Sequence, residues 1–368
     1  MPSKQYSRRA RSLTSLVLAG LIVLTGCGSH AAGSEASGDG KTLESVTVLD
    51  NPKDHVGPST AMLAGGQIDP VAKNPEPQLP VTITDAQDKE VTVTDISRIL
   101  PLDLYGSSAR IVYDLGLGDQ VVGRDTSTTF KEAEDLPMVT QNGHELNAEA
   151  ILQLAPTVII TDSSLGPWDV IEQMRQAGIP VVTLDSTRSL ESAAEMITSI
   201  ATALGVPEEG KKLAERTSNQ IEEITSQIAQ IAPEGDERLR MLLLYARGQS
   251  GVYYIFGQDS GADSLITSLG GIDVATEIGW EGMRPMTDEA MVEAEPDLVI
   301  MMSGGLESVG GVDGITTTVP ALAHTPAGVN KRIVDMADSQ LLSFGPNSAA
   351  VLEALSVAVY APEAANEQ

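Results

Sequence analysis

The chain has 368 residues, with 51 acidic and 23 basic side chains and a formal net charge of −28 at pH 7. A protein this acidic is a poor candidate for binding nucleic acid, or an anionic membrane surface, through its general field. Its single cysteine excludes an internal disulfide. The folded part must therefore be held together by packing alone, and an anionic ligand must be held by a few local positive groups.

The N-terminal residues have the layout of a bacterial export signal. Four basic residues within the first eleven positions precede an uncharged apolar run over 13–24. This run is too short to be a good membrane-spanning helix, which needs about 20 apolar residues. It ends in Leu-Thr-Gly-Cys27, which resembles a lipobox, the motif whose cysteine receives a lipid. We therefore predict a signal peptide over 1–26, lipidation of Cys27 and a lipid-anchored location at the extracytoplasmic face of the cell membrane. The export route, general or twin-arginine, stays open.

The stretch that follows the lipobox has the composition of a linker. Residues 27–80 are rich in Gly, Ser, Ala, Pro and Asp and show little periodicity. This pattern predicts a flexible tether between the lipid and the folded part of the protein. The folded part is expected to begin with a β-hairpin, because 81–84 and 91–94 alternate apolar residues with threonine.

Short apolar runs then alternate with helical patterns. The expected strands cover 121–123, 157–160 and 181–184, and the expected helices cover 148–154 and 168–177. Such alternation predicts an α/β fold with mainly parallel sheets. We assign the first α/β lobe to 81–206.

An internal repeat extends this prediction to the second half of the chain. The segment 146–160 recurs at 286–300 with a constant offset of 140. In each copy an N-cap residue, Asn147 or Thr287, opens a short helix, a proline ends it and a buried strand follows. One unit repeated at a domain-sized separation predicts two similar lobes, the second over 233–368.

A helical pattern lies between the two predicted lobes. Pro207 is suited to the first turn of a helix, and the apolar residues that follow recur at helical spacing. A helix over 207–232 would reach about 36 Å, enough to join two lobes. An ordinary surface helix is the alternative interpretation.

Two further segments indicate a family. Residues 115–124 (Leu-Gly-Leu-Gly-Asp-Gln-Val-Val-Gly-Arg) and 149–160 look like hallmarks of an N-terminal lobe in one class of binding proteins. Together with the two lobes, the linking helix and the lipobox, they resemble the substrate-binding proteins of ABC importers for haem, iron-siderophores and cobalamin. The resemblance covers about 81–362 and is greatest to haemin-binding lipoproteins of the HmuT type. It implies a ligand cleft between the lobes, haem as the transported ligand, and an ABC permease with its ATPase as partners.

The resemblance also implies the haem ligands. In that family a His from one lobe and a Tyr from the other bind the iron axially, and an Arg two residues after the Tyr supports it. The matching residues are His144, Tyr245 and Arg247. His144 precedes a predicted helix, where Gly143 allows the backbone to turn, and a neutral imidazole is a good iron ligand. Tyr245 ends the apolar run 241–244, and both ferric iron and a neighbouring guanidinium favour its phenolate form.

Other residues have weaker indications. Arg284 occupies the repeat position of His144, so it is a candidate partner for a haem propionate, with an ordinary salt bridge as the alternative. Met302 follows the repeated strand and is a candidate haem contact. Glu149 and Glu289 sit at equal positions in the two lobes and are candidates for docking on permease arginines, as binding proteins of this class do. Asp169 is a second candidate for the docking residue of the N-terminal lobe. The alternative role of all these acids is to stabilise the first turn of a helix.

Three other functions fit the sequence less well than haem delivery. A ferric siderophore or cobalamin is the main alternative cargo, although a siderophore site needs several converging arginines and no iron ligand from the protein. A divalent-metal site gathers several histidines, whereas 81–368 holds only His144 and His324. An enzyme is disfavoured because we find no phosphate-binding loop, His-Glu-x-x-His or Gly-x-Ser-x-Gly motif. Further expected partners are the membrane, through the lipid, and other haem-binding surface proteins, but not nucleic acid.

Overall fold

The computed structural model describes residues 40–367, except 142 and 249–252. The chain divides into one unit over Met1–Ser34, outside the described residues, and a larger compact unit over Glu35–Gln368. The expected signal peptide, Cys27 and residues 27–39 of the expected tether also lie outside the described residues. All further statements concern the larger unit.

The N-terminal lobe is built on a parallel sheet in the order β4-β5-β6, with the hairpin β2-β3 beside it. The hairpin is antiparallel and pairs Val81 with Val93, as the alternating pattern predicts. The expected strand at 121–123 forms only an isolated parallel bridge from Val121 to Ile99. The strands are β2 (Val81–Thr84), β3 (Glu90–Val93), β4 (Ile99–Leu102), β5 (Val158–Thr161) and β6 (Val181–Thr183). The helices are α1 (Ser107–Val112), α2 (Ala148–Leu154), α3 (Trp168–Gln176) and α4 (Ala193–Ala203).

The C-terminal lobe is built on a mixed sheet in the order β1-β12-β11-β7-β8-β10, with β9 paired to β7. The strands are β1 (Ser59–Ala61), β7 (Arg240–Ala246), β8 (Tyr253–Phe256), β9 (Ile272–Asp273), β10 (Met283–Pro285), β11 (Leu298–Met302) and β12 (Ile333–Met336). The helices are α6 (Ala262–Ser268), α7 (Val274–Glu277), α8 (Asp288–Ala294), α9 (Ser303–Ser308), α10 (Gly311–Thr318), α11 (Pro326–Val329), α12 (Asp338–Leu341), α13 (Ser348–Tyr360) and α14 (Pro362–Asn366).

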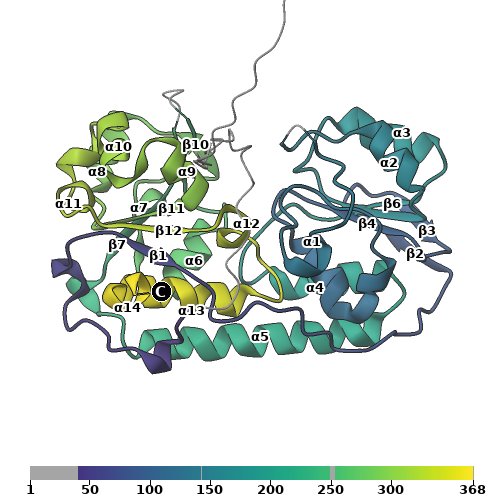
Figure 1. Ribbon diagram of the computed structural model, residues 1–368, viewed down its shortest axis with the longest axis horizontal. Coiled ribbons are helices and arrows are strands. Elements are labelled where there is room, and N and C mark those ends of the chain that lie inside the picture. Colours follow the sequence, from purple (N-terminus) through teal and green to yellow (C-terminus); the bar gives the residue numbers. More distant parts are fainter. Residues whose placement is uncertain (1–39, 142, 249–252, 368) are drawn as a thin grey trace, which may run out of the picture. The chain divides into compact units, whose positions relative to one another are not determined.

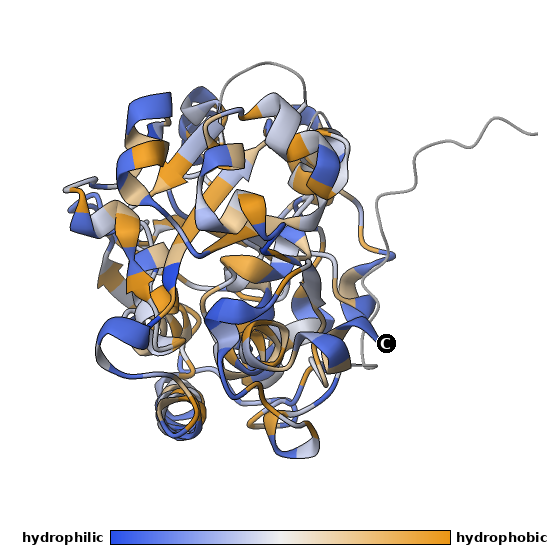
Figure 2. Cartoon of the chain, turned by 90° about the vertical axis from the view of Figure 1, so that its left-hand side faces the viewer, coloured by the Kyte–Doolittle hydropathy of each residue, from blue (hydrophilic) through white to orange (hydrophobic). Residues whose placement is uncertain are grey.

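Apolar packing covers both faces of the central strands. Along β7, Leu243 belongs to one buried cluster while Leu242 and Leu244 belong to another, as expected for a strand whose side chains alternate between two covered faces. Figure 2 shows polar and apolar residues side by side along many helices, which fits helices that cover a core with one face. Among the described residues, no helix combines the length and the apolar character that crossing a membrane requires.

The sequence repeat is also a structural repeat. The side chain of Asn147 accepts a hydrogen bond from the Ala150 amide at the start of α2, and Thr287 does the same for Ala290 at the start of α8. Both helices then end on a left-handed residue with φ near 45° and 41°. The strands β5 and β11 follow at the same distance. The predicted α/β class with two similar lobes is therefore confirmed.

A pair of arginines completes this repeat, and the sequence pattern did not reveal them. Arg98 precedes β4, and its Nε donates to the carbonyl of Leu154 at 2.9 Å, at the end of α2. Arg240 begins β7, and its Nη2 donates to the carbonyl of Ala294 at 2.9 Å, at the end of α8. A positive group at a helix C-terminus satisfies open carbonyls and interacts favourably with the helix dipole.

Helix α5 (Pro207–Ala229) joins the two lobes. Its first half packs on α4, where Leu213 enters the core of the N-terminal lobe. Its second half packs on α13, where Ile224 and Ile228 enter the core of the C-terminal lobe. Figure 1 shows α5 running beneath both lobes. The helix thus belongs to two cores at once.

The prediction of a flexible tether is wrong for residues 40–80. This stretch contains the 3-10 helices η1 (Leu43–Ser45) and η2 (Pro52–Asp54), and β1 pairs in parallel with β12. Leu43, Ala61 and Leu63 are buried in the core of the C-terminal lobe. The chain then hydrogen-bonds to the N-terminal lobe, where the Gln78 amide donates to Gly205 at 2.7 Å. Its few apolar residues are too scattered to show a period, yet they pack against a core formed by distant segments.

Candidate functional site

His144 lies on the loop that leads into α2. Gly143 has a positive φ of 82°, which gives the turn expected before the histidine. Glu145 forms a bridge with Gly166, and the amide of Asn147 donates to the carbonyl of Val139 at 2.9 Å. The His144 side chain is exposed. The loop is therefore attached to the lobe on both sides of a solvent-accessible imidazole.

Tyr245 and Arg247 lie at the end of β7, in the other lobe. Tyr245 is half-buried, and its ring centroid is 6.3 Å from that of its cross-strand neighbour Tyr254. Arg247 donates a hydrogen bond to the side chain of Tyr245, and this bond is the main cause that raises the pKa of Arg247. The Arg247 Nη1 also lies 3.9 Å from Oδ2 of Asp338. Arg247 and Tyr245 are thus in direct contact.

The charge of Arg247 in the C-terminal lobe affects the pKa of His144 in the N-terminal lobe. Desolvation lowers this pKa, and the positive charge of Arg247 lowers it further. His144 in one lobe therefore interacts electrostatically with Arg247 in the other, and Arg247 in turn contacts Tyr245.

Two further candidate contacts lie on other strands of the C-terminal sheet. Met302 ends β11, which pairs with β7, and its half-buried side chain packs on the core of the C-terminal lobe. Arg284 is exposed on β10, where its Nε donates to the carbonyl of Glu281 at 3.0 Å. Met302 therefore lies one strand away from Tyr245, whereas the Arg284 side chain contacts its own loop.

The acidic residues expected to dock on a permease are accessible. Glu149 and Glu289 are exposed in the first turns of α2 and α8, and Glu149 accepts a hydrogen bond from Gln153 at 3.3 Å. Asp169 is exposed in the first turn of α3, and His324 is exposed at the end of the 3-10 helix η7 (Leu322–His324).

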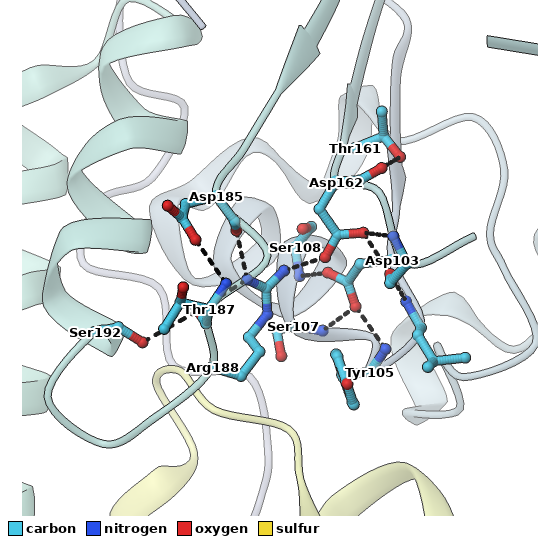
Figure 3. Close-up of polar contacts among 12 residues, drawn as sticks. Asp103, Tyr105, Ser107, Ser108, Thr161, Asp162, Asp185, Thr187, Arg188 and Ser192 are labelled. Carbon is cyan, nitrogen blue, oxygen red and sulfur yellow. Dashed lines mark hydrogen bonds and ion pairs between the residues drawn. The ribbon is translucent and has the colours of Figure 1, made fainter. Parts of the chain in front are cut away.

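The main feature that sequence reasoning missed is a buried polar network in the N-terminal lobe (Figure 3). Asp103 follows β4, Asp162 follows β5 and Asp185 lies just after β6. The buried Arg188 forms an ion pair with Asp162, and its Nη1 donates to the carbonyl of Asp185 at 2.7 Å. An aspartate shortly after each of three buried strands was a signal that could have revealed this network, because parallel strands end at one edge of a sheet.

The network also fixes the start of α1. Asp103 accepts hydrogen bonds from the amides of Tyr105 and Ser108 at 2.7 and 2.6 Å, and the guanidinium of Arg188 lies 5.8 Å from the centre of the Tyr105 ring. Behind it, the fully buried Asp125 accepts from the Asp103 amide at 3.1 Å. Desolvation, followed by the negative Asp103, raises the pKa of Asp125 to about 7.

The loop that carries Arg188 connects the two lobes. Leu190 is buried in the core of the C-terminal lobe, and its amide donates to Oγ of Ser264 on α6 at 3.2 Å. Gly261 allows this contact, because a Cβ there would lie 2.6 Å from the carbonyl oxygen of Arg188. A hydrogen bond of 3.0 Å from Thr129 to Ser339 joins the lobes at a second place.

Two cavities are lined by residues other than the predicted haem ligands. One of about 300 Å³ is bordered by α5, α13 and the Arg110–Asp114 ion pair, and one of about 40 Å³ lies beside Tyr105 and Ser339. Across the described residues, no group of three or more His, Cys, Asp or Glu side chains is arranged to hold a metal ion.

Comparison with known proteins identifies the family. The model of the periplasmic binding protein family matches residues 103–339, which is more than half of the chain. The chain belongs to this family. Its members are substrate-binding transport proteins, in keeping with the two-lobed fold.

Individual members of the family show which kind of binding protein the chain resembles. A crystal structure of the heme binding protein HmuT is 44% identical, with a TM-score of 0.80, over 84% of this chain and 99% of that one. Three structures of HmuT variants, each with one histidine, tyrosine or arginine replaced by alanine, are also similar.

Proteins similar in sequence give a second comparison. The uncharacterized ABC transporter substrate-binding lipoprotein YvrC of Bacillus subtilis (strain 168) is 27% identical over 82% of this chain and 94% of its own length. The Vitamin B12-binding protein of Vibrio campbellii is 29% identical over only 39% of this chain and 50% of its own length. The predicted resemblance to the HmuT type is confirmed.

Proposed function

We propose that the protein binds haem outside the cytoplasm and delivers it to an ABC haem importer. The observation that carries this proposal is the 44% identity to a heme binding protein over 99% of that protein's length. The similarity to a vitamin B12-binding protein covers 39% of the chain and supports cobalamin much less.

In this proposal His144 and Tyr245 bind the ferric iron of haem from opposite faces. The lowered pKa of His144 supports its role, because only the neutral imidazole offers a lone pair to iron. The hydrogen bond from Arg247 to Tyr245 supports the other ligand, because a positive donor stabilises the charge of a phenolate. The tyrosine and arginine replaced in the HmuT variants are two positions apart, as Tyr245 and Arg247 are here.

The rest of the site would hold the porphyrin. A haem pocket is mainly apolar with a few polar anchors. Tyr254 and Met302 lie on the strands next to Tyr245 and supply apolar surface on that side. Arg284 is exposed and within the same lobe, and we assign it to a haem propionate.

Delivery requires a place at the membrane and a surface for the permease. Residues 1–26 would direct export, and the lipid on Cys27 would hold the protein at the extracytoplasmic face of the membrane. The relative YvrC is named a lipoprotein. Glu149 and Glu289, exposed at equal positions of the two lobes, would contact arginines of the permease. Docking that separates the lobes would break one axial bond and start release.

The first experiment is a visible spectrum of the purified mature chain with ferric haemin. The wild-type protein is expected to give a stable spectrum of tyrosinate-ligated ferric haem, and His144→Ala and Tyr245→Ala are each expected to change it. His324→Ala is the matched control, since His324 is exposed in the C-terminal lobe and takes no part in the proposed site. A wild-type spectrum identical to that of free haemin would overturn the proposal and turn attention to cobalamin and siderophores.

A further inference from the structure

We infer that Leu152 and Val292 form an apolar contact with the permease, one on each lobe, beside the proposed docking residues Glu149 and Glu289. The inference rests on the proposed function and assigns two contact residues to its docking step. We define the α2 patch as Glu149, Leu152 and Gln153, and the α8 patch as Glu289, Val292 and Glu293.

Exposure and the internal repeat single out these two residues. The large hydrophobic side chains that are exposed among the described residues are Val56, Leu152, Met283, Val292 and Val329. One such residue on a surface needs no explanation. Leu152 and Val292, however, are separated by the repeat offset of 140, and they are 41% and 52% exposed on equivalent helices. Both copies of the unit therefore place an aliphatic side chain in solvent at the same position.

The needs of the fold do not account for these side chains. The residues just before them, Ile151 and Met291, are fully buried and supply the core contact of each helix. The next residue along a helix points about 100° away from its neighbour, so Leu152 and Val292 leave the core face. Valine is also a poor helix former at an exposed position, because its branched side chain loses rotamer freedom. At position 292, helix stability alone would therefore favour a residue that is not β-branched.

The composition of the two patches indicates the kind of partner. Residues three apart share a helix face, so Glu149 lies beside Leu152, and Glu289 lies beside Val292. Each patch thus offers a carboxylate next to an aliphatic group and fits a basic group flanked by apolar surface. A lipid surface is a poor occupant, because anionic headgroups would be repelled by acidic patches on a chain of charge −28.

The duplication of the patch specifies the partner further. In Figure 1, α2 and α8 both lie on the side of their lobes opposite α5, so one partner surface can reach both. Two like patches are matched by two like sites. The occupant is therefore a permease surface with two like sites, each basic and apolar, one facing each lobe.

The test measures how the haem-loaded full-length protein binds the haem permease–ATPase complex of the same organism in nanodiscs. Leu152→Gln and Val292→Gln are each expected to weaken binding by about fivefold, and the double variant by roughly 25-fold, since the sites are independent. This loss should be the same at low and high salt, whereas the loss from Glu149→Gln and Glu289→Gln should shrink at high salt. Val56→Gln and Val329→Gln are matched controls, because these valines are 67% and 69% exposed but lie outside the repeat.

The outcomes separate this inference from the proposed function. Wild-type binding that the double variant retains within twofold, with normal haem spectra, would overturn the apolar contact and leave haem delivery standing. An equal loss in the Val329→Gln control would also overturn it. Binding of the wild type to protein-free vesicles of anionic lipid, lost in the double variant, would replace the permease by the membrane as occupant. A wild-type protein that binds haem but not the complex would overturn both delivery and this inference.

Discussion

At the scale of single residues, Arg247 occupies the central position in the proposed site. It donates to Tyr245, lies 3.9 Å from Asp338 and acts electrostatically on His144. One guanidinium thus donates to the proposed tyrosine ligand and favours the neutral form of the proposed histidine ligand. The neutral imidazole is the form that binds iron.

The first prediction concerns the pKa of His144. Arg247→Ala removes a positive charge, so the pKa of His144 should rise, and protons should compete with haem at a higher pH. Haem affinity of this variant should therefore fall more steeply between pH 8 and pH 6 than that of the wild type. NMR titration of the His144 ring gives the pKa, with Arg284→Ala as the control. An unchanged His144 pKa would contradict the proximity of the two residues.

The second prediction concerns Asp125, whose pKa is raised to about 7 in the folded protein. An unfolded aspartate titrates near 3.9, so the folded state binds the extra proton between these values. The contribution of Asp125 to the free energy of unfolding is therefore greatest at low pH and is lost as pH rises through 7. It should fall by about 1.4 kcal/mol between pH 6 and pH 8.

Urea unfolding at several pH values tests this prediction. Asp125→Asn cannot titrate, so its free energy of unfolding should vary less with pH over this range than that of the wild type. Parallel curves for the two proteins would show that Asp125 is already ionised in the fold at pH 6.

At the scale of elements, the loop over 185–192 joins a polar network in one lobe to the apolar core of the other. Arg188 forms an ion pair with Asp162 within the N-terminal lobe, while Leu190 packs into the core of the C-terminal lobe. A buried charge that loses its partner is costly, whereas an apolar replacement of the whole pair can be neutral. We therefore expect the ion pair to fix the position of the loop more than to add net stability.

The third prediction tests this buried ion pair. Arg188→Met should lower the free energy of unfolding by about 3 kcal/mol, because Asp162 is left buried without its partner. The double variant Arg188→Met, Asp162→Leu should recover part of this loss, as measured by a double-mutant cycle in urea. Lys331→Met, which breaks the exposed pair with Asp313, serves as the control and should have little effect. A full, additive loss in the double variant would contradict the pairing.

At the scale of the whole molecule, the segment over 40–80 extends the C-terminal sheet and then reaches the N-terminal lobe. Strand β1 covers Arg332, a buried arginine whose Nη1 donates to Oγ of Ser59 at 3.3 Å. Desolvation lowers the pKa of Arg332 to about 10. Removing this segment would open the core around Leu43 and Leu63 and remove one hydrogen-bond acceptor of a buried cation.

The fourth prediction compares two truncated chains. A protein that starts at Gly40 should keep the Tm of the mature chain, whereas one that starts at Gly65 should melt about 10 °C lower, because several buried apolar side chains are lost. Calorimetry of the two proteins provides the measurement. Equal Tm values would show that residues 40–64 are not part of the cooperative fold.

The sequence by itself determined the features that depend on local pattern. The repeat with offset 140 predicted two lobes, the alternation at 81–84 and 91–94 predicted the hairpin, and the spacing after Pro207 predicted the helix that forms α5. These follow from hydrogen bonding and burial within a few turns of chain, so periodicity reveals them. The resemblance to the HmuT type also rested on short motifs, and His144, Tyr245 and Arg247 were selected from it.

Only the tertiary structure decided which distant residues meet. Three features join segments that lie 26 or more positions apart. They are the pairing of β1 with β12, the ion pair of Arg188 with Asp162, and the electrostatic interaction of Arg247 with His144. The run 121–123 also shows that local pattern does not decide pairing. Its apolar residues predicted a strand, but in the structure only Val121 forms a bridge, to Ile99. A short apolar run can serve equally as a strand or as core filling. Which of the two it becomes depends on the segments that pack beside it in the folded chain, because burial and strand pairing depend on both surfaces in contact.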